Sequence, residues 1–129
     1  MLKLTTCGLF VKDMETMVTF YRDVMGLKTQ WNHEPNAELS NGPMRLIMFS
    51  RHDFEAMTAQ KFSYPEGTNG TLELAFDAEN YAGVDREFAR VTALGAVPVL
   101  KPVTEPWGQR TCYVADPEGN LIEISSFIQ

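Results

Sequence analysis

Two copies of one pattern decide the fold: Asn41-Gly42 followed by Leu46-Ile47-Met48-Phe49-Ser50, and Gly119-Asn120 followed by Leu121-Ile122-Glu123-Ile124-Ser125. Each copy joins a turn signal to a run of strand-forming residues. The likeness predicts that one supersecondary unit occurs twice in the chain, with Met48 and Glu123 in equivalent places.

The residues before the first copy predict a strand, a helix and further strands. Residues 3–11 alternate as a strand does, with Cys7, Leu9 and Val11 on one face and Thr6, Gly8 and Phe10 on the other. A helix is expected from the Asp13 cap to the Gly26 stop. Short strands are then expected over about 27–32, 36–40 and 43–50.

The residues before the second copy predict the same order. A strand over 71–78 leads to a helix over 80–94, which Gly95 ends, and to a short strand over 97–100. A hairpin over 109–115 and 120–127 turns at Asp116-Pro117-Glu118-Gly119. We therefore expect an α+β fold within 1–129: a module over about 1–50, a connector with a short helix over about 51–70, and a module over about 71–129. Two tandem βαβββ modules would form a curved eight-stranded mixed sheet around a cleft.

The composition of the chain excludes some classes of binding partner. The chain has 129 residues and a net charge of -6, which argues against nucleic acid and against an anionic membrane surface. No apolar stretch reaches the length of a membrane span, and Met1 runs directly into a strand pattern, so a cytoplasmic protein is expected. Cys7 and Cys112 form no CxxC pattern and are expected to be free thiols.

Two motifs carry a resemblance to a known family. The stretch Phe20-Tyr21-Arg22-Asp23-Val24-Met25-Gly26-Leu27 resembles the FYxxxLGL signature of the vicinal oxygen chelate superfamily, and residues 113–123, YVADPEGNLIE, resemble its YxxDPxGNxxE signature. The family includes glyoxalase I, extradiol dioxygenases, fosfomycin-modifying transferases and bleomycin-binding resistance proteins. The resemblance implies the glyoxalase/bleomycin resistance/dioxygenase fold, with its paired βαβββ modules, and a homodimer.

The resemblance also implies where a metal would bind. Enzymes of the family place ligands at four strand positions, which match Thr6, Met48, Glu73 and Glu123 here. These are expected to face the cleft, opposite the helix-packing residues Leu9, Phe49, Phe76 and Ile124. Threonine is a poor ligand for a divalent cation and methionine suits soft copper, so only two suitable ligands remain. No tightly bound metal is expected; a divalent ion (Zn, Ni, Mn or Fe) would use Glu73 and Glu123.

The two glutamates also have uses without a metal. In an apolar cleft, Glu73 and Glu123 could hold a cationic or polar ligand, and crowding would raise one pKa enough for proton transfer. The alternative is a solvated pair satisfied by neighbours such as Arg110. We take Glu123 and Glu73 as the candidate catalytic residues.

The remaining candidate ligand contacts are Thr6, Phe10, Met48, Trp31, Trp107 and Arg110. Phe10 and Met48 are expected to face the cleft, and the two tryptophans to lie near its rim. Ordinary packing in the core is the alternative for Phe10, Met48 and Trp31; for Trp107, the Pro-Trp-Gly loop favours an exposed position. Arg110 could anchor an anionic group, neutralise Glu123 or form a surface ion pair.

The sequence therefore predicts a glyoxalase/bleomycin-resistance-like protein that binds a small organic ligand without a complete catalytic metal site. The alternative is a metal-dependent lyase, isomerase or dioxygenase that uses the two glutamates. A third interpretation is a pocket without function in a protein kept as an interaction partner. Whether the protein is an enzyme stays open, because this fold serves metal enzymes and metal-free binders alike.

Overall fold

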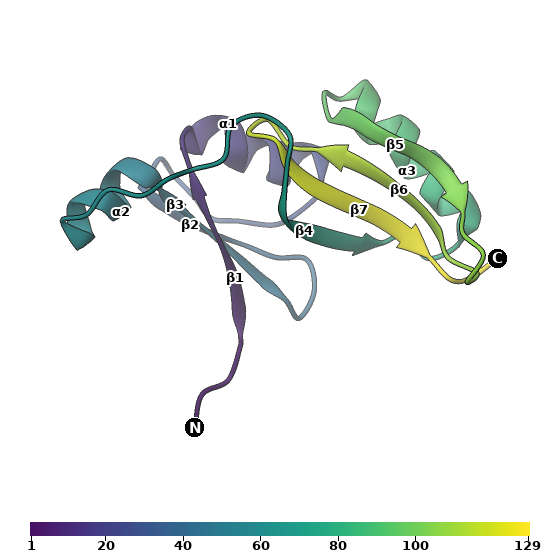
Figure 1. Ribbon diagram of the computed structural model, residues 1–129, viewed down its shortest axis with the longest axis horizontal. Helices are drawn as coiled ribbons and strands as arrows, with labels where there is room; N and C mark the ends of the chain where they lie inside the picture. The colour runs from purple at the N-terminus through teal and green to yellow at the C-terminus, as the bar shows by residue number, and fades with distance from the viewer. The chain divides into compact units, whose positions relative to one another are not determined.

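The computed structural model describes residues 1–129, which divide into two compact units, Met1–Tyr64 and Pro65–Gln129. Figure 1 labels the helices and strands of both units. The helix of the expected connector belongs to the first unit, since it contacts two of that unit's strands. The units are described in turn.

The first unit contains a mixed sheet of three strands in the order β1-β3-β2. Strand β1 (Thr6–Val11) pairs in parallel with β3 (Arg45–Ser50), and β2 (Asn36–Leu39) pairs antiparallel with β3. The register sorts the side chains into two faces. One face is buried and apolar: Leu9, Val11, Ala37, Leu39, Leu46 and Met48. The other, the open face of the first unit, carries Thr6, Gly8, Phe10, Asn36, Glu38, Arg45, Ile47 and Phe49.

The predicted helix after β1 is confirmed. Helix α1 (Met14–Thr19) begins where the Asp13 side chain accepts a hydrogen bond from the Thr16 backbone N–H at 3.1 Å. It continues as one π-helical turn, η1 (Phe20–Val24), in which the Met25 N–H reaches back five residues to the Phe20 carbonyl. Gly26 ends it with φ of 83°, a conformation that glycine adopts without a steric penalty.

An aromatic cluster joins α2 (Arg51–Thr58) to one end of the open face of the first unit. The Phe54 ring lies 4.1 Å from Phe10 and 5.9 Å from Phe49, centroid to centroid, and 5.1 Å from Phe62. The Arg51 guanidinium donates to the Phe10 carbonyl at 3.0 Å. These contacts close that end of the face and hold α2 on the strands that carry Phe10 and Phe49.

The strand expected over 27–32 does not form. Only Lys28 and Ser40 make a bridge, so the sheet has three strands and the chain seven. The following residues bond to one another instead: the Thr29 hydroxyl accepts from the Trp31 N–H, and Glu34 accepts from Asn32 and from the Trp31 indole. Such local bonds compete with a sheet ladder, and here they turn the chain away from β2.

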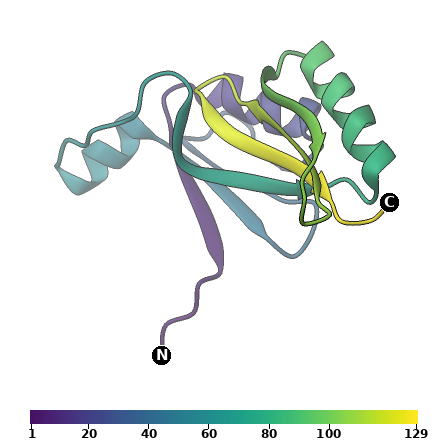
Figure 2. The same cartoon turned by 45° about the vertical axis from the view of Figure 1, so that its right-hand side comes forward.

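The second unit contains a sheet of four strands in the order β4-β7-β6-β5. Strand β4 (Asn69–Asp77) is parallel to β7 (Asn120–Ser126), while β6 (Arg110–Ala115) is antiparallel to both β7 and β5 (Val97–Thr104). Helix α3 (Tyr81–Ala93) covers one face of β7, β6 and β5 (Figure 2). The apolar core between helix and sheet includes Val84, Val91, Cys112, Val114, Ile122 and Ile124.

The turn between β6 and β7 is fixed by its own residues. The buried Asp116 carboxylate accepts from the Glu118 and Asn120 backbone N–H groups at 2.9 and 3.0 Å. Gly119 has φ of 89°, and a Cβ there would lie 2.0 Å from the Gly67 carbonyl oxygen. The turn therefore requires glycine and sets the register of the hairpin.

The α+β class and the tandem arrangement are confirmed, since each unit opens with a strand and a helix and continues with antiparallel partners. Both cysteines are free, as predicted. Burial raises the pKa of the Cys112 thiol to about 11, so it is a packing residue and not a reactive thiolate.

Candidate functional site

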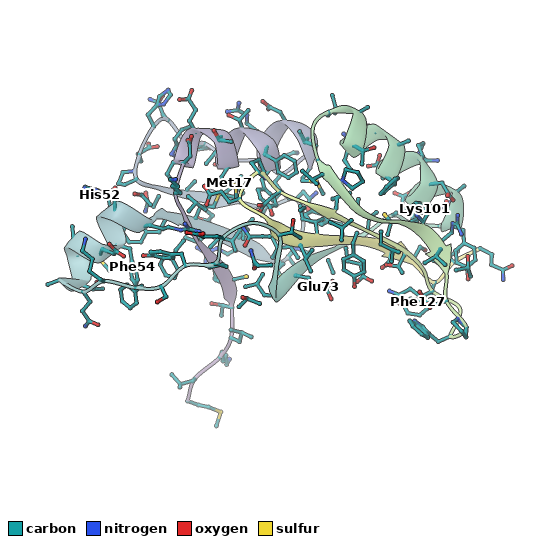
Figure 3. All side chains as sticks on the ribbon, turned by 45° about the horizontal axis from the view of Figure 1, so that its top comes forward. Met17, His52, Phe54, Glu73, Lys101 and Phe127 are labelled. Carbon is teal, nitrogen blue, oxygen red and sulfur yellow. The ribbon has the colours of Figure 1, made fainter.

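Glu73 and Glu123 share one face of the second sheet, as predicted. In the parallel register Glu73 lies opposite Leu121, and Ala75 opposite Glu123, so both glutamates point away from the face that carries Phe76 and Ile124. Figure 3 labels Glu73 on β4. We call the face with Glu73 and Glu123 the carboxylate face.

Tyr113 brings the two carboxylates into one group. It is the cross-strand neighbour of Glu123 in the β6–β7 hairpin, so its side chain lies on the carboxylate face. Burial raises the pKa of the Tyr113 hydroxyl, and hydrogen bonding to Glu73 and the charge of Glu123 raise it further. Tyr113 is therefore a protonated donor at neutral pH, held beside two acceptors.

Glu123 is also held by two other donors. The hydroxyl of the buried Thr111 donates to its Oε2 at 2.7 Å, and the Gln109 amide donates to the same oxygen at 3.4 Å. The Gln109 side-chain oxygen in turn accepts from the Trp107 indole N–H at 2.9 Å. A chain of hydrogen bonds thus runs from an exposed indole to the carboxylate.

The loop that carries Trp107 is rigidly held. The Glu105 N–H donates to the Gln109 carbonyl at 2.8 Å, and the Gly108 N–H donates to the Glu105 carbonyl at 3.0 Å. The Tyr81 hydroxyl of α3 donates to the Gly108 carbonyl. Trp107 nevertheless stays 64% exposed, which agrees with the expected position outside the core and leaves the ring free to contact a ligand.

Arg110 does not neutralise Glu123. Its guanidinium makes two bonds to the Asp85 carboxylate of α3, at 2.7 and 2.8 Å, and a third to the Thr104 hydroxyl at 2.9 Å. It lies opposite Ser126 in the hairpin, one residue out of step with Thr111 and Tyr113, so it points to the helix side. Of the interpretations offered by the sequence, the structural ion pair is the one that the contacts support.

Met48 does not share a face with Thr6, so that prediction is wrong. Met48 lies opposite Leu9 in the parallel register and is 0% exposed, whereas Thr6 lies opposite Arg45. The position that corresponds to Glu123 is Ile47, because Glu73 stands two residues before the partner of Glu123 and Thr6 stands two residues before the partner of Ile47. Aligning the two halves by their turns shifts β3 by one residue, and a shift of one residue exchanges the faces of a strand.

Thr6 and Phe10 lie on the open face of the first unit, as predicted, and Phe49 joins them there instead of packing behind the sheet. Phe10 is 42% exposed and stacks on Phe54, so part of its ring belongs to the aromatic cluster. The Thr6 hydroxyl forms a hydrogen bond with the neighbouring Thr5 hydroxyl at 3.3 Å.

Trp31 lines a groove in the first unit. The groove has a volume of about 850 Å³ and lies between residues 28–34 and the side chains of β2 and β3 on the open face. Ile47 also lines it. Trp31 therefore contributes to a hollow surface of the first unit, while its place at the rim of a cleft between the modules stays a prediction.

The sequence analysis missed Thr111, Gln109 and Tyr113. The sequence contains a signal for Thr111 and Tyr113, because residues at equal distance from the turn of a tight hairpin lie opposite each other. Counting outward from residues 116–119 pairs Tyr113 with Glu123 and places Thr111 on the same face. Gln109 lies beyond β6 in a loop, so its contact with Glu123 follows only from the folded chain.

A family model described as a glyoxalase-like domain matches residues 4–129. The chain belongs to this glyoxalase-like family. It is thus a member of the vicinal oxygen chelate superfamily, as its two motifs suggested.

This glyoxalase-like protein is similar to several known proteins. It is 29% identical over 127 residues to the uncharacterized protein YraH of Bacillus subtilis (strain 168), covering 95% of this chain and 97% of that one. A glyoxalase/bleomycin resistance protein/dioxygenase family enzyme from Burkholderia phytofirmans PsJN has a TM-score of 0.83 at 22% identity, with 96% and 98% covered. Protein ATC0852 from Agrobacterium tumefaciens has a TM-score of 0.78 at 27% identity, with both chains covered fully.

In this glyoxalase-like chain, the donors of the two units differ. By strand register, Thr6 and Ile47 in the first unit correspond to Glu73 and Glu123 in the second, so equivalent positions carry different side chains. Within neither unit do three His, Cys, Asp or Glu side chains gather as a metal-binding group. The longest helix, α3, has 13 residues, and none of the helices could span a lipid bilayer.

Proposed function

We propose that this glyoxalase-like protein binds a small organic molecule and lacks a complete catalytic metal site. The observation that carries the proposal is the group on the carboxylate face, where Tyr113 interacts with Glu73 and Glu123 while Thr111 and Gln109 hold Glu123 in place. Fixed donors and acceptors beside an exposed Trp107 ring are typical of a surface that orients a polar ligand.

The carboxylate face offers a ligand three kinds of contact. Glu73 and Glu123 are acceptors for ammonium, amide or hydroxyl groups, Tyr113 is a donor, and Trp107 is a flat apolar surface. Hydrogen bonds from Trp107 to Gln109 and from Gln109 to Glu123 link the indole ring to the carboxylate. A ligand that moves the indole ring would therefore also move the Glu123 carboxylate. This supports binding of a ligand with a polar group attached to an apolar body.

The donor set does not fit the metal centre that the family uses. A catalytic site of this kind normally has three or more protein ligands. In the first unit, the corresponding residues are Thr6, which offers a hydroxyl, and Ile47, which offers no ligand atom. In the second unit they are the carboxylates of Glu73 and Glu123. The Glu123 carboxylate already accepts a hydrogen bond from Thr111 at 2.7 Å. We therefore assign the two glutamates to direct contact with a ligand.

The metal content of the protein tests this proposal. The protein is purified without chelator, and its metals are measured alongside those of Glu123→Gln and of Glu66→Gln, an exposed glutamate outside the carboxylate face. We expect less than about 0.1 equivalent of any divalent metal in all three proteins, and no rise in melting temperature with Zn, Mn, Ni, Co or Fe(II). Stoichiometric metal that only Glu123→Gln removes would overturn the proposal.

The second candidate is a metal-dependent lyase, isomerase or dioxygenase that uses Glu73 and Glu123. It is favoured by one observation, that both carboxylates interact with the same Tyr113 hydroxyl and so lie near each other. Water and substrate oxygens would then complete the metal's ligands. The metal measurement separates the two candidates.

A ligand screen tests binding directly. Melting temperatures of the wild type, Tyr113→Phe and Trp107→Ala are compared over a library of small acids, amines and neutral aromatic compounds. We expect a subset to stabilise the wild type and to stabilise the variants less. A library without any stabilising compound would favour the third interpretation, an interaction protein. The homodimer and the cytoplasmic location stay predictions.

A further inference from the structure

The groove of the first unit lies beside residues 28–34, where the sequence predicts a strand and the structure has only the bridge between Lys28 and Ser40. Lys28 still pairs with Ser40, but the chain then turns away from β2, and the space between them opens. Its volume of about 850 Å³ lies in the range of small-molecule pockets. The groove is therefore a built feature of the fold, produced by the turn over residues 29–34.

One wall of the groove is a fixed aromatic ring. The Trp31 indole N–H donates to the Glu34 carbonyl at 2.7 Å, and its backbone N–H donates to the Thr29 hydroxyl at 3.1 Å. The His33 ring lies 4.9 Å from the indole, centroid to centroid. Because the ring is already held, stacking a ligand on it costs little side-chain entropy.

Three of the four charged residues along the groove have partners. Arg45 and Glu38 form an ion pair between β3 and β2, and the Glu34 carboxylate accepts from the Asn32 N–H at 2.6 Å. The backbone of Lys28 pairs with Ser40, but its side chain makes no hydrogen bond or ion pair, so the ammonium is the charge left for a ligand. An anion is the chemical complement of such a group.

The net charge of the first unit does not oppose the binding of an anion in the groove. Residues 1–64 contain seven Lys and Arg and seven Asp and Glu, whereas residues 65–129 contain four and ten. The net charge of -6 thus belongs entirely to the second unit. An anion at Lys28 meets no net negative charge from the unit that forms the groove.

We propose that this groove binds an organic acid with a flat ring. The ring stacks on Trp31, with Ile47 as an apolar contact, and the carboxylate pairs with the Lys28 ammonium. The proposal rests on the proposed function in that the ligand is a small molecule. It adds a site within residues 1–64 and a chemical class for what enters it.

The probes are 2-naphthoate, its neutral analogue 2-naphthamide, and the cation 2-naphthylmethylamine. Each is titrated into the full chain, and backbone amide shifts are followed by NMR. We expect 2-naphthoate to shift residues of the groove and to bind about tenfold tighter than the amide, the size of one charge-assisted hydrogen bond. The amine should bind more weakly than the amide.

Two variants locate the contacts. Lys28→Met keeps the aliphatic stem and should bring the affinities for acid and amide within about twofold of each other, while Lys3→Met, a lysine outside the groove, should leave the preference intact. Trp31→Leu should weaken both aromatic probes together. Amide spectra of the variants without ligand show whether each is folded.

Other results overturn the groove assignment. Equal affinity for acid and amide in the wild type would do so, as would failure of 2-naphthoate to bind at millimolar concentration. Shifts confined to residues of the carboxylate face, such as Thr111 and Tyr113, would also refute the groove while leaving the proposed function in place. The ligand screen above would refute that function separately.

Discussion

The Thr111 hydroxyl donates a hydrogen bond of 2.7 Å to Glu123 Oε2, and Thr111 is buried while Glu123 is partly exposed. A buried donor thus fixes the orientation of a carboxylate that can still meet a ligand. This bond is the strongest geometric sign that the carboxylate face is ordered before any ligand arrives.

Removing that hydroxyl should destabilise the protein moderately. Thr111→Val keeps the shape of the side chain but leaves Glu123 with the long bond from Gln109, at 3.4 Å, and the interaction with Tyr113. We expect the free energy of unfolding to fall by about 1.5 kcal/mol in a urea titration, the usual value for a hydrogen bond to a charged group. Thr71→Val, on the exposed part of β4, is the control and should change it by less than about 0.5 kcal/mol. Equal effects of the two would refute the role of the bond.

Tyr113 should titrate above the pH at which ordinary tyrosines ionise. Burial and Glu73 raise its folded pKa above the unfolded value of about 10. Its contribution to stability is therefore complete below about pH 10 and is lost as the pH rises through the folded pKa. An NMR titration of the Tyr113 ring carbon, assigned with Tyr113→Phe, measures this. Glu73→Gln should lower the pKa only partly, because burial is the larger cause; a wild-type pKa near 10 would contradict the prediction.

The ion pair between Arg110 and Asp85 should contribute about 0.5–1 kcal/mol near neutral pH, since it is bidentate but the Asp85 side chain is half exposed. A double-mutant cycle with Arg110→Gln and Asp85→Asn isolates the coupling. Arg110 lowers the folded pKa of Asp85, so the stabilisation is present above the unfolded pKa of about 3.9 and is lost as the pH falls through the folded value. Coupling that persists at pH 2 would argue against this account.

Adjacent residues of β3 should differ in how strongly a polar side chain destabilises the protein. Met48→Gln places an amide in the fully buried core and should lower the free energy of unfolding by about 2–4 kcal/mol. Ile47→Gln faces the groove and should cost less than about 1 kcal/mol. Chemical denaturation of both variants compares them. The reverse order would show that the register of β1 on β3 is wrong.

Gly119 should not tolerate a side chain. A Cβ there would lie 2.0 Å from the Gly67 carbonyl oxygen, and φ is 89°. Gly119→Ala should lower the free energy of unfolding by about 2 kcal/mol or more. Gly42→Ala is the matched control, because its Cβ would meet nothing within 4 Å. Calorimetry should show a lower melting temperature for the first variant alone, and similar values would refute the steric argument.

Much of the fold could be predicted because its signals are local. The Asp13 cap, the Gly26 stop and the turn over residues 116–119 each act within a few residues and are found as expected. The strand over 27–32 does not form, and the reason is local too: Thr29 and Glu34 accept hydrogen bonds within the turn, and only Lys28 bridges to Ser40. Alternating apolar residues predict a strand but not whether a partner ladder forms.

The candidate site was predicted only in part. Glu73 and Glu123 were found from the motif and from alternation within their strands, and they do share a face. Arg110 was linked to Glu123 because they are close in the hairpin, but the hairpin register puts Arg110 on the helix side, where Asp85 binds it. A carboxylate on another element cannot be found from the spacing of the hairpin alone.

By itself, the sequence determined that the chain has two like halves, where their helices begin and end, and that the second half holds the carboxylates. Only the tertiary structure decided that Ile47, and not Met48, corresponds to Glu123, and that Tyr113 and Thr111 join the glutamates. The physical reason is the two-residue period of a strand: a shift of one residue is nearly invisible in a sequence alignment, yet it moves every side chain to the opposite face. Hydrogen bonds between neighbouring strands remove that ambiguity.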